Sequence, residues 1–498
     1  MGSLHDRKKG DHPGLGDLLP KGEITRSGNS GMKKVLLISS WTNEKKVLGY
    51  YLSPPIGVYR LQRWLQDRHD VDVLDPNLDN PIEFLKSGKR YDVIGFSPTK
   101  DNLHNDIFLM RYCRLVFPSA VQVLGGVEAT CNHQQMLALT GADYIVLNEG
   151  EKALAALLDN LTSLSLPPSI VTNQFSYSTV LNADEIALAT DLDYNRMRVR
   201  EYWRRNSAVT GGDLLSTNCV NMYITNYCPQ GCKFCSTTRF IRQACPAGTK
   251  VVAIPPLALV DLITKVLAQL PDTKTIYFHD DNACHYRQMT IDWCRASIRQ
   301  GIDVSYVASS RINHFDAEVL DIMKRAGFRK LSVGIEAYSD PLLRKMGKGQ
   351  TVRMIDDFIE LTRKMDMPLN INLMLCVPEA DRDDVKRTAE FALRMLENRN
   401  NTVTVHPYVK AYAGSWYHDN WDLIEYRYST VPSGHGVKGG DAVRIPHRFL
   451  PRDAKVREIL MQLDHAMENS PDFIKMKTDS FLMSQFSEKL CQLLLEVA

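Results

Sequence analysis

The chain has 498 residues, of which 24% are charged, and its formal net charge at pH 7 is +2. This length predicts about three domains, and the interspersed acids and bases form no basic patch of the kind that binds nucleic acid or a membrane surface. The sequence has no run of eighteen apolar residues, no charged-then-apolar leader and no regular framework among its 11 cysteines, so we expect a cytoplasmic protein with reduced thiols and without nucleic-acid or membrane partners.

Residues 1–31 are rich in Gly, Lys and Asp and lack apolar periodicity, which predicts a flexible arm. From 32 to 163, strand and helix patterns alternate quickly. This alternation predicts a Rossmann-like α/β domain with a parallel, doubly wound sheet of five strands, and a ligand at the carboxyl ends of those strands. Strands are expected at 35–39, 71–74, 92–97, 121–125 and 143–147, and helices near 57–69, 102–117, 132–140 and 151–162.

Residues 164–215 lose this rhythm and predict a linker. The alternation resumes over 216–410, where six βα units are too few for a closed eight-stranded barrel and predict a partial (β/α)6 barrel. Residues 411–498 predict a small, mainly helical cap domain with helices near 453–468 and 484–497. The expected barrel strands are 219–226, 274–279, 303–309, 330–335, 369–376 and 402–408, and the expected barrel helices are 257–270, 286–301, 316–327, 351–367 and 381–397.

Three cysteines, Cys228, Cys232 and Cys235, stand in the run Cys-Pro-Gln-Gly-Cys-Lys-Phe-Cys after an apolar segment. Three thiolates on one short loop can hold three irons of a four-iron cluster and leave the fourth iron open to a small molecule. The alternative is a structural zinc knuckle, for which Cys245 would supply the fourth ligand.

This cysteine spacing is that of the radical S-adenosylmethionine (SAM) enzymes, and over residues 32–410 the chain resembles the cobalamin-binding-domain class of that family. Further motifs that carry the resemblance are Leu124-Gly-Gly126, Asn148-Glu-Gly-Glu151, Phe278-His-Asp-Asp281, Ser310-Arg311 and Gly334-Ile-Glu336. The resemblance implies a [4Fe-4S] cluster, SAM that is reductively cleaved to a 5′-deoxyadenosyl radical, and a domain able to bind cobalamin.

In the first domain the resemblance points to four cobalamin-binding residues. Ser97 and Thr99 are able to hydrogen-bond a ligand, although they would serve equally as helix caps. Gly125 and Gly126 permit close approach of a ligand, although a tight turn would also need them. The loop over 40–46 contains no histidine, so it offers no protein ligand for cobalt, and Glu128 stands where this class often has histidine.

In the barrel the resemblance implies that the three cysteines bind the cluster and that four residues bind SAM. Phe234 would lie beside the cluster, Arg311 would bind the methionyl carboxylate, Glu336 the ribose, and Met374 would line the adenine side. Surface ion pairing is the alternative for Arg311. The candidate catalytic residues are Asp280, Asp281, Tyr227 and His406; helix capping is the alternative for one of the aspartates, and a solvated strand end for His406.

The expected function is therefore hydrogen abstraction from a small polar metabolite, in natural-product biosynthesis, with cobalamin-assisted C-methylation as the favoured outcome. An electron donor such as flavodoxin or ferredoxin is the expected protein partner. Dehydration, oxidation or rearrangement without cobalamin is the alternative reaction. A cobalamin- or cluster-based sensor is the alternative outside enzymes, and the set of SAM-orienting residues argues against it.

Overall fold

The computed structural model describes residues 31–42, 53–161, 169–171, 180–210, 218–237, 240, 250–477 and 482–498. The predicted arm over 1–31 lies outside the described residues except for Gly31, as does Cys245. None of the described helices is long and apolar enough to cross a membrane.

The first domain is built on a parallel sheet of six strands in the order β2-β1-β3-β4-β5-β6. Five of these strands match the prediction to within two residues. The sixth, β6, comes from the segment predicted to be linker, so the expected count of five was too low. It has only three residues, which is too short for a periodic signal. The strands are β1 (Lys34–Ser39), β2 (Asp70–Leu74), β3 (Val93–Ser97), β4 (Val121–Leu124), β5 (Tyr144–Val146) and β6 (Ser169–Val171).

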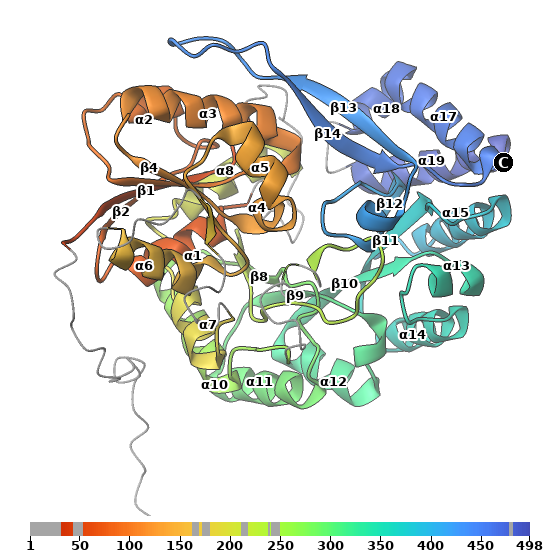
Figure 1. The fold of residues 1–498 in the computed structure, drawn as a ribbon. Coiled ribbons are helices and arrows are strands. Elements are labelled where there is room, and N and C mark those ends of the chain that lie inside the picture. The colour runs from red at the N-terminus through yellow and green to blue at the C-terminus, as the bar shows by residue number, and fades with distance from the viewer. Residues whose placement is uncertain are drawn as a thin grey trace, which may run out of the picture. The chain divides into compact units, whose positions relative to one another are not determined.

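Helices cover both faces of this sheet, as Figure 1 shows. Because successive side chains of a strand point to opposite faces, Val35 and Leu37 pack with α1 and α6, whereas Leu36 and Ile38 belong to the core under α3 and α5. Burial on both faces explains why these strands read as continuous apolar runs. The helices of this domain are α1 (Ile56–Leu65), α2 (Pro81–Leu85), α3 (Leu103–Val116), α4 (Gly126–Cys131), α5 (His133–Thr140) and α6 (Gly150–Asn160), with a 3-10 turn η2 (Lys100–Asn102).

The predicted linker also contains two helices, α7 (Ala183–Thr190) and α8 (Val199–Thr210), so its interpretation as a plain connection was wrong. Asn182 caps α7 through a reciprocal pair of hydrogen bonds with Glu185. The segment packs against both domains through Tyr202, whose hydroxyl donates to Asp75, and Trp203, whose indole donates to the carbonyl of Cys219 at 2.7 Å.

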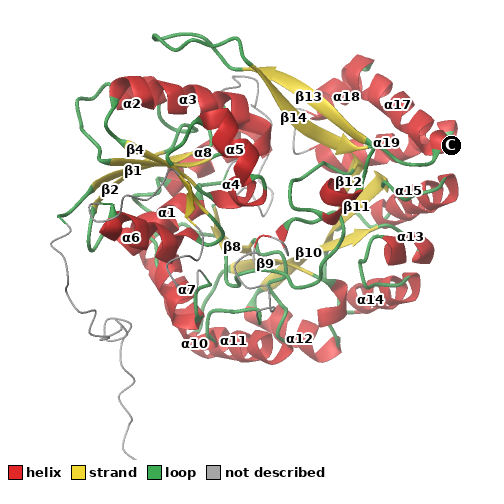
Figure 2. Ribbon diagram, in the orientation of Figure 1, coloured by secondary structure: helices red, strands yellow, loops and turns green. Residues whose placement is uncertain are grey.

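The second sheet is the predicted partial barrel: six parallel strands in sequential order, with no pairing of β7 to β12. Its helices lie outside the strands (Figure 2). The strands are β7 (Cys219–Met222), β8 (Thr275–Phe278), β9 (Ser305–Ser310), β10 (Phe328–Glu336), β11 (Leu369–Cys376) and β12 (Thr402–Tyr408). The helices are α10 (Pro256–Gln269), α11 (Arg287–Gln300), α12 (Ala317–Ala326), α13 (Asp340–Lys345), α14 (Val352–Lys364) and α15 (Arg382–Leu396), with a 3-10 turn η4 (Ile312–His314).

The C-terminal region contains the predicted helices α17 (Ala454–Asn469) and α19 (Met483–Val497), with α16 (Trp416–Asn420) and α18 (Pro471–Lys477). It also contains an antiparallel hairpin, β13 (Ile424–Thr430) and β14 (Ala442–Phe449), that the sequence did not indicate. Helix α19 covers the edge strand β12, where Ser487 Oγ accepts from the amide of Val405 at 3.0 Å. An edge amide is thereby paired within the chain.

Candidate active site and cofactor pockets

The three cysteines lie on the loop that follows β7, with Cys232 buried and Cys228 and Cys235 half-buried. In the described part of the chain, no three His, Cys, Asp or Glu side chains gather closely enough to hold a single metal ion. Cys245, the alternative fourth ligand of a zinc knuckle, lies outside the described residues. Three thiolates on one short loop suit a cluster, because each thiolate there binds a different iron.

The start of this loop is held by Asp280, which follows β8. Its buried carboxylate accepts hydrogen bonds from the amides of Ile224 and Thr225, at 2.9 and 2.6 Å, and from the Thr225 hydroxyl at 2.7 Å. Burial raises the pKa of Asp280 to about 7, although these bonds oppose the shift. The structure thus gives Asp280 a positioning contact, and its predicted catalytic role stays a prediction. Asp281 is open to solvent.

The middle of the cysteine loop is held by Lys233. Its amide donates to the carbonyl of Met346 at 3.0 Å, and its ammonium group pairs with Glu379 at 2.9 Å and lies 4.4 Å from the ring centre of Trp416. Tyr417 completes the contact, because its hydroxyl donates to Glu379 at 2.9 Å and its amide to the Lys233 carbonyl at 3.1 Å. The C-terminal region is therefore part of the support of the cysteine loop.

Arg311, at the end of β9, is brought to the cysteine loop as expected. It is buried, with Nη1 3.6 Å from Sγ of Cys232 and Nη2 donating to the carbonyl of Lys348. Its Nε has no hydrogen-bond partner among the described residues. A buried guanidinium without a carboxylate, beside the cysteines, has the donors that a methionyl carboxylate needs.

Behind Arg311 lies Asn282, a fully buried residue that the sequence analysis did not single out. Its Oδ1 accepts from the Arg311 amide at 3.3 Å and from the Ser310 hydroxyl at 2.8 Å, and its Nδ2 lies 3.2 Å from His285 Nδ1 and 3.0 Å from His314 Nε2. Since a backbone amide can only donate, the amide group of Asn282 has one possible orientation. Both imidazoles therefore accept at these nitrogens.

Glu336 ends β10 at a shift of register and has φ of 71°. A left-handed conformation at a residue other than glycine marks a site where the surrounding structure holds the backbone in place. Its Oε1 pairs with Lys348 Nζ at 2.9 Å, and that ammonium group lies 5.9 Å from the ring centre of Phe234. A Cβ on Gly334 would come within 2.2 Å of Glu336 Oε1, so glycine makes room for the carboxylate.

The outward residues of the barrel strands, such as Val333 and Leu373, form the core under the helices. The inward faces of the same strands carry polar residues. Tyr277 and Ser309 share a hydrogen bond of 2.7 Å, and Asn370 donates to Ser332 at 3.1 Å. Further along this face, Met374 and His406 pair in register on β11 and β12. Desolvation lowers the pKa of His406, and the negative charge of Glu336 opposes the shift.

Tyr227 lies apart from this group. It is buried and packs with Val251, Phe240 and Tyr286. Packing of this kind favours a structural role beside Cys228, and the predicted catalytic role of Tyr227 remains a prediction.

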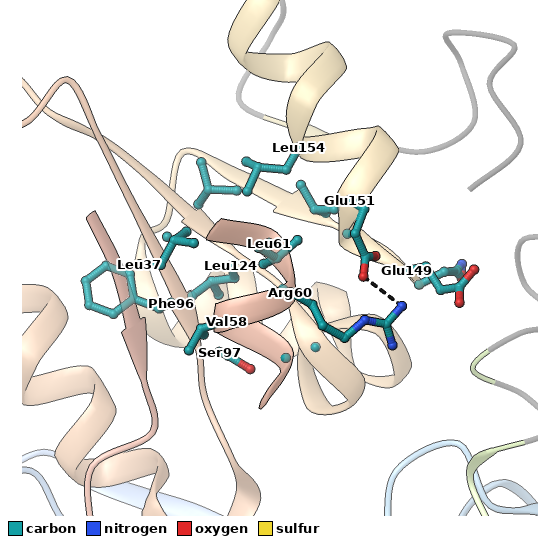
Figure 3. A pocket seen from close by; sticks show the side chains of 18 of the residues that line it. Leu37, Val58, Arg60, Leu61, Phe96, Ser97, Leu124, Glu149, Glu151 and Leu154 are labelled. Carbon is teal, nitrogen blue, oxygen red and sulfur yellow. Dashed lines mark ion pairs between the residues drawn. The ribbon is translucent and has the colours of Figure 1, made fainter. Parts of the chain in front are cut away.

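A pocket of about 220 Å³ opens at the carboxyl ends of β1, β3, β4 and β5 (Figure 3). Ser97, Gly125 and Gly126 line it, as the sequence analysis expected of a cobalamin site. Most of its remaining wall is apolar, and at its polar end Arg60 pairs with Glu151 at 2.9 Å. The other lining residues are Leu37, Gly57, Val58, Leu61, Gly95, Phe96, Val123, Leu124, Val146, Asn148, Glu149, Gly150, Leu154, Asn226 and Phe240.

Glycines keep this pocket open. Gly126 has φ of +88°, and a Cβ there would lie 2.9 Å from Ser97 Oγ; a Cβ on Gly95 would lie 2.9 Å from Leu37 Cδ2. Such a cradle fits a flat or ring-shaped ligand group. Thr99 does not line the pocket. Its hydroxyl shares a hydrogen bond with Ser40 at 2.7 Å, and its amide donates to Asp106 at 3.2 Å, although its side chain makes no capping bond to the following 3-10 turn.

Comparison with known proteins matches the two halves separately. The Radical SAM superfamily model matches residues 222–392, and the B12 binding domain model matches residues 49–158. These domains, together with the cysteine loop and the pocket, define a radical SAM enzyme rather than a sensor. In particular, the chain belongs to the class with a cobalamin-binding domain, and its cofactors are a [4Fe-4S] cluster, SAM and cobalamin.

Curated relatives include an uncharacterized methyltransferase of Pyrococcus horikoshii, 24% identical over 73% of this chain and 78% of the relative. The hopanoid C-3 methylase of Methylococcus capsulatus is 23% identical over 84% of this chain and 78% of the relative. Among solved structures, the cobalamin-dependent SAM radical enzyme OxsB, with aqua-cobalamin and SAM bound, has a TM-score of 0.66 and 14% identity, with 93% of this chain and 72% of that chain covered. At this identity the last likeness shows the fold alone.

Several residues that support the site had no predicted role, above all Asn282, Lys348 and the pair Lys233–Glu379. Lys348 lies in Lys345-Met-Gly-Lys348 and Glu379 in Pro378-Glu379, two short motifs next to predicted barrel elements. The position of these charged residues, Glu379 just after a predicted strand and Lys348 just before a predicted helix, was the pattern that could have indicated a role in the site. Asn282 directly follows the two aspartates and offered no signal of its own.

Proposed function

We propose that this enzyme methylates a carbon atom of a small polar metabolite, in natural-product biosynthesis, with cobalamin and SAM both bound. The observation that carries the proposal is the wall of the cobalamin pocket. Asn226, only two residues before Cys228, lines the same pocket as Gly125 and Gly126. The curated relatives named as a methyltransferase and a methylase support the same reaction.

Each cofactor has residues suited to hold it. Cys228, Cys232 and Cys235 would ligate the cluster, Arg311 would bind the carboxylate of SAM, and the glycine cradle would hold cobalamin. When bound, the cluster and SAM supply a carbon radical able to remove hydrogen from an unactivated carbon, and cobalamin supplies a carrier for the methyl group.

The chain's own residues position the reactants and restrict water. Phe234 and Met374 would shield the adenosyl group, and Glu336, held by Lys348 at 2.9 Å, would accept from ribose hydroxyls. Asp281 and His406 are the candidates for proton movement near the substrate, because both are titratable groups, one directly after β8 and the other near the end of β12. An external one-electron donor such as flavodoxin or ferredoxin would reduce the cluster.

The test uses SAM that carries an isotopic label in its methyl group. Reconstituted, cobalamin-loaded enzyme is reduced under anaerobic conditions and incubated with candidate polar metabolites. We expect labelled product together with 5′-deoxyadenosine and S-adenosylhomocysteine. An unlabelled product that has lost water or hydrogen, formed by cobalamin-free enzyme, would refute methylation and support the alternative reactions.

A further inference from the structure

A group of cations gathers where the loop after β3 meets the segment after β12. Lys100 is buried there, with Nζ 3.3 Å from the carbonyl oxygen of Ala411 and 4.5 Å from the ring centre of Tyr412. Among the described residues, no carboxylate oxygen lies within 4 Å of this ammonium group. A buried charge without an opposite charge is costly, so such a group marks a place where an anion would be stabilising.

A second group at this place also lacks a partner. His447, on β14, is buried, and its Nε2 makes no hydrogen bond among the described residues. Its ring lies 5.2 Å from that of Tyr408. The charge of neighbouring Arg448 is paired with Glu425 at 2.9 Å and Asp464 at 2.6 Å, although its Nε has no hydrogen-bond partner among the described residues, and Lys410 pairs with Asp101 at 3.3 Å. Lys100 and His447 are therefore the groups that have no carboxylate partner here, within the described part of the chain, and could bind an added anion.

The electrostatics agree with this geometry. Burial lowers the pKa of Lys100 to about 8, with the positive charges of Lys410 and Arg427 adding to the shift and Asp101 and Glu128 opposing it. Burial also lowers the pKa of His447 to about 3, with Arg427, Arg448 and Lys100 contributing. The exposed Arg427 thus acts on both groups. In this environment an additional negative charge would be attracted from several sides.

Lys410 and Lys100 lie on two segments of chain that come from the two cofactor sites. Strand β12 carries His406 and ends at Tyr408, and Lys410 follows two residues later. On the other side, Lys100 follows Ser97, which lines the cobalamin pocket, by three residues. A substrate that reacts between the two cofactors would therefore extend naturally to this place.

We propose that Lys100, His447 and Arg427 bind an oxyanion of the substrate, a carboxylate or a phosphate, and so fix the orientation of the reacting carbon. The inference rests on the proposed function, since it assigns the substrate class for that reaction. Tyr408 and Tyr412 flank the group and would restrict its access to water.

The proposal is tested by binding of inorganic phosphate, which needs no turnover and so stays separate from the outcome of the methylation test. The melting temperature of cobalamin-loaded protein is followed as phosphate is added, with sodium chloride at matched ionic strength as the reference. We expect phosphate, but not chloride, to raise the Tm. No response to phosphate would overturn the proposal.

Two variants locate the binding. Lys100→Met removes the buried charge, so we expect a higher Tm without phosphate and loss of the phosphate response. Arg427→Gln alters an exposed side chain, and we expect it to weaken phosphate binding about tenfold. Lys89→Met is the control, because Lys89 is an exposed cation of the same domain paired with Asp72 at 2.9 Å. An unchanged phosphate response in both test variants would refute the site.

Cobalamin carries a phosphate of its own, so the same chemistry has a second source. Phosphate titrations of cobalamin-free and cobalamin-loaded protein separate the two sources. Equal binding in both forms supports the substrate site. Loss of phosphate binding on cobalamin loading would overturn the proposal and assign the cations to the cofactor.

Discussion

Replacement of Asn282 tests whether Arg311 is positioned by the network behind it. In Asn282→Leu, which has a similar volume, the Arg311 amide and the Ser310 hydroxyl lose their buried acceptor. Each unsatisfied buried group costs about 1–3 kcal/mol, so the free energy of unfolding should fall by about 2–6 kcal/mol. If Arg311 moves, the loss of a charge-assisted contact to SAM should weaken its binding by roughly ten- to a hundredfold.

The matched variant is Asn282→Asp. Its carboxylate still accepts from the Arg311 amide and the Ser310 hydroxyl, and the neutral imidazoles of His285 and His314 can shift their protons so as to donate to it. We therefore expect Asn282→Asp to keep most of the SAM affinity that Asn282→Leu loses. Comparison of the two variants separates loss of an acceptor from mere change of the side chain.

The assay is equilibrium binding of SAM to the anaerobically reconstituted protein, with the iron content and the cluster absorbance measured in parallel. Full iron content in Asn282→Leu together with weakened SAM binding would support the positioning role. Equal SAM affinity in wild type and Asn282→Leu would refute the reasoning, because Arg311 would then hold its place without Asn282.

Three further predictions follow from the site. Cys232→Ala should abolish the cluster absorbance and all formation of 5′-deoxyadenosine, whereas Cys284→Ala, at a buried thiol, should keep both; iron analysis and product assay decide. Gly126→Val should lower cobalamin content by about tenfold, measured by visible absorption, because its side chain would meet Ser97 Oγ; full retention would contradict the cradle. Burial, with the charges of His285 and Arg311, lowers the pKa of His314 to about 4, so the unfolded chain gains a proton first and stability should fall as pH drops from about 6.5 to 4; urea unfolding at several pH values, with a smaller fall in His314→Phe, checks this.

The strands of both sheets could be predicted to within a few residues because parallel strands covered on both faces read as apolar runs. The hairpin β13–β14 was not predicted, although Ile424, Tyr426 and Tyr428 alternate with polar residues as in a half-exposed strand. Helix α8 escaped notice because its sequence Val199-Arg-Glu-Tyr-Trp-Arg-Arg is dominated by charged residues, although Val199, Tyr202 and Trp203 mark its buried side at helical spacing.

The residues of the candidate site also differ in how clearly the sequence indicates them. Cysteine spacing and glycine pairs are local patterns, so the sequence could indicate the cysteine loop and the two glycines that line the pocket. The ion pair of Glu336 with Lys348 and the pair of Lys233 with Glu379 join residues 12 and 146 positions apart. Such pairs depend on barrel closure and loop register, which a single sequence does not specify. Thr99 was expected to bind the ligand and does not line the pocket, because its hydroxyl is bonded to Ser40 on the neighbouring loop.

The connection between the two cofactor sites lies in a short stretch of chain. Asp280 fixes Ile224 and Thr225, Asn226 then lines the cobalamin pocket, and Cys228 follows two residues later. Asn226 also accepts from the amide of Val252 at 2.8 Å, so its side chain is held from a second direction. A change at Asp280 should therefore disturb cobalamin binding and cluster assembly together. This coupling follows from the order of residues in one loop, and it requires no conformational signal between domains.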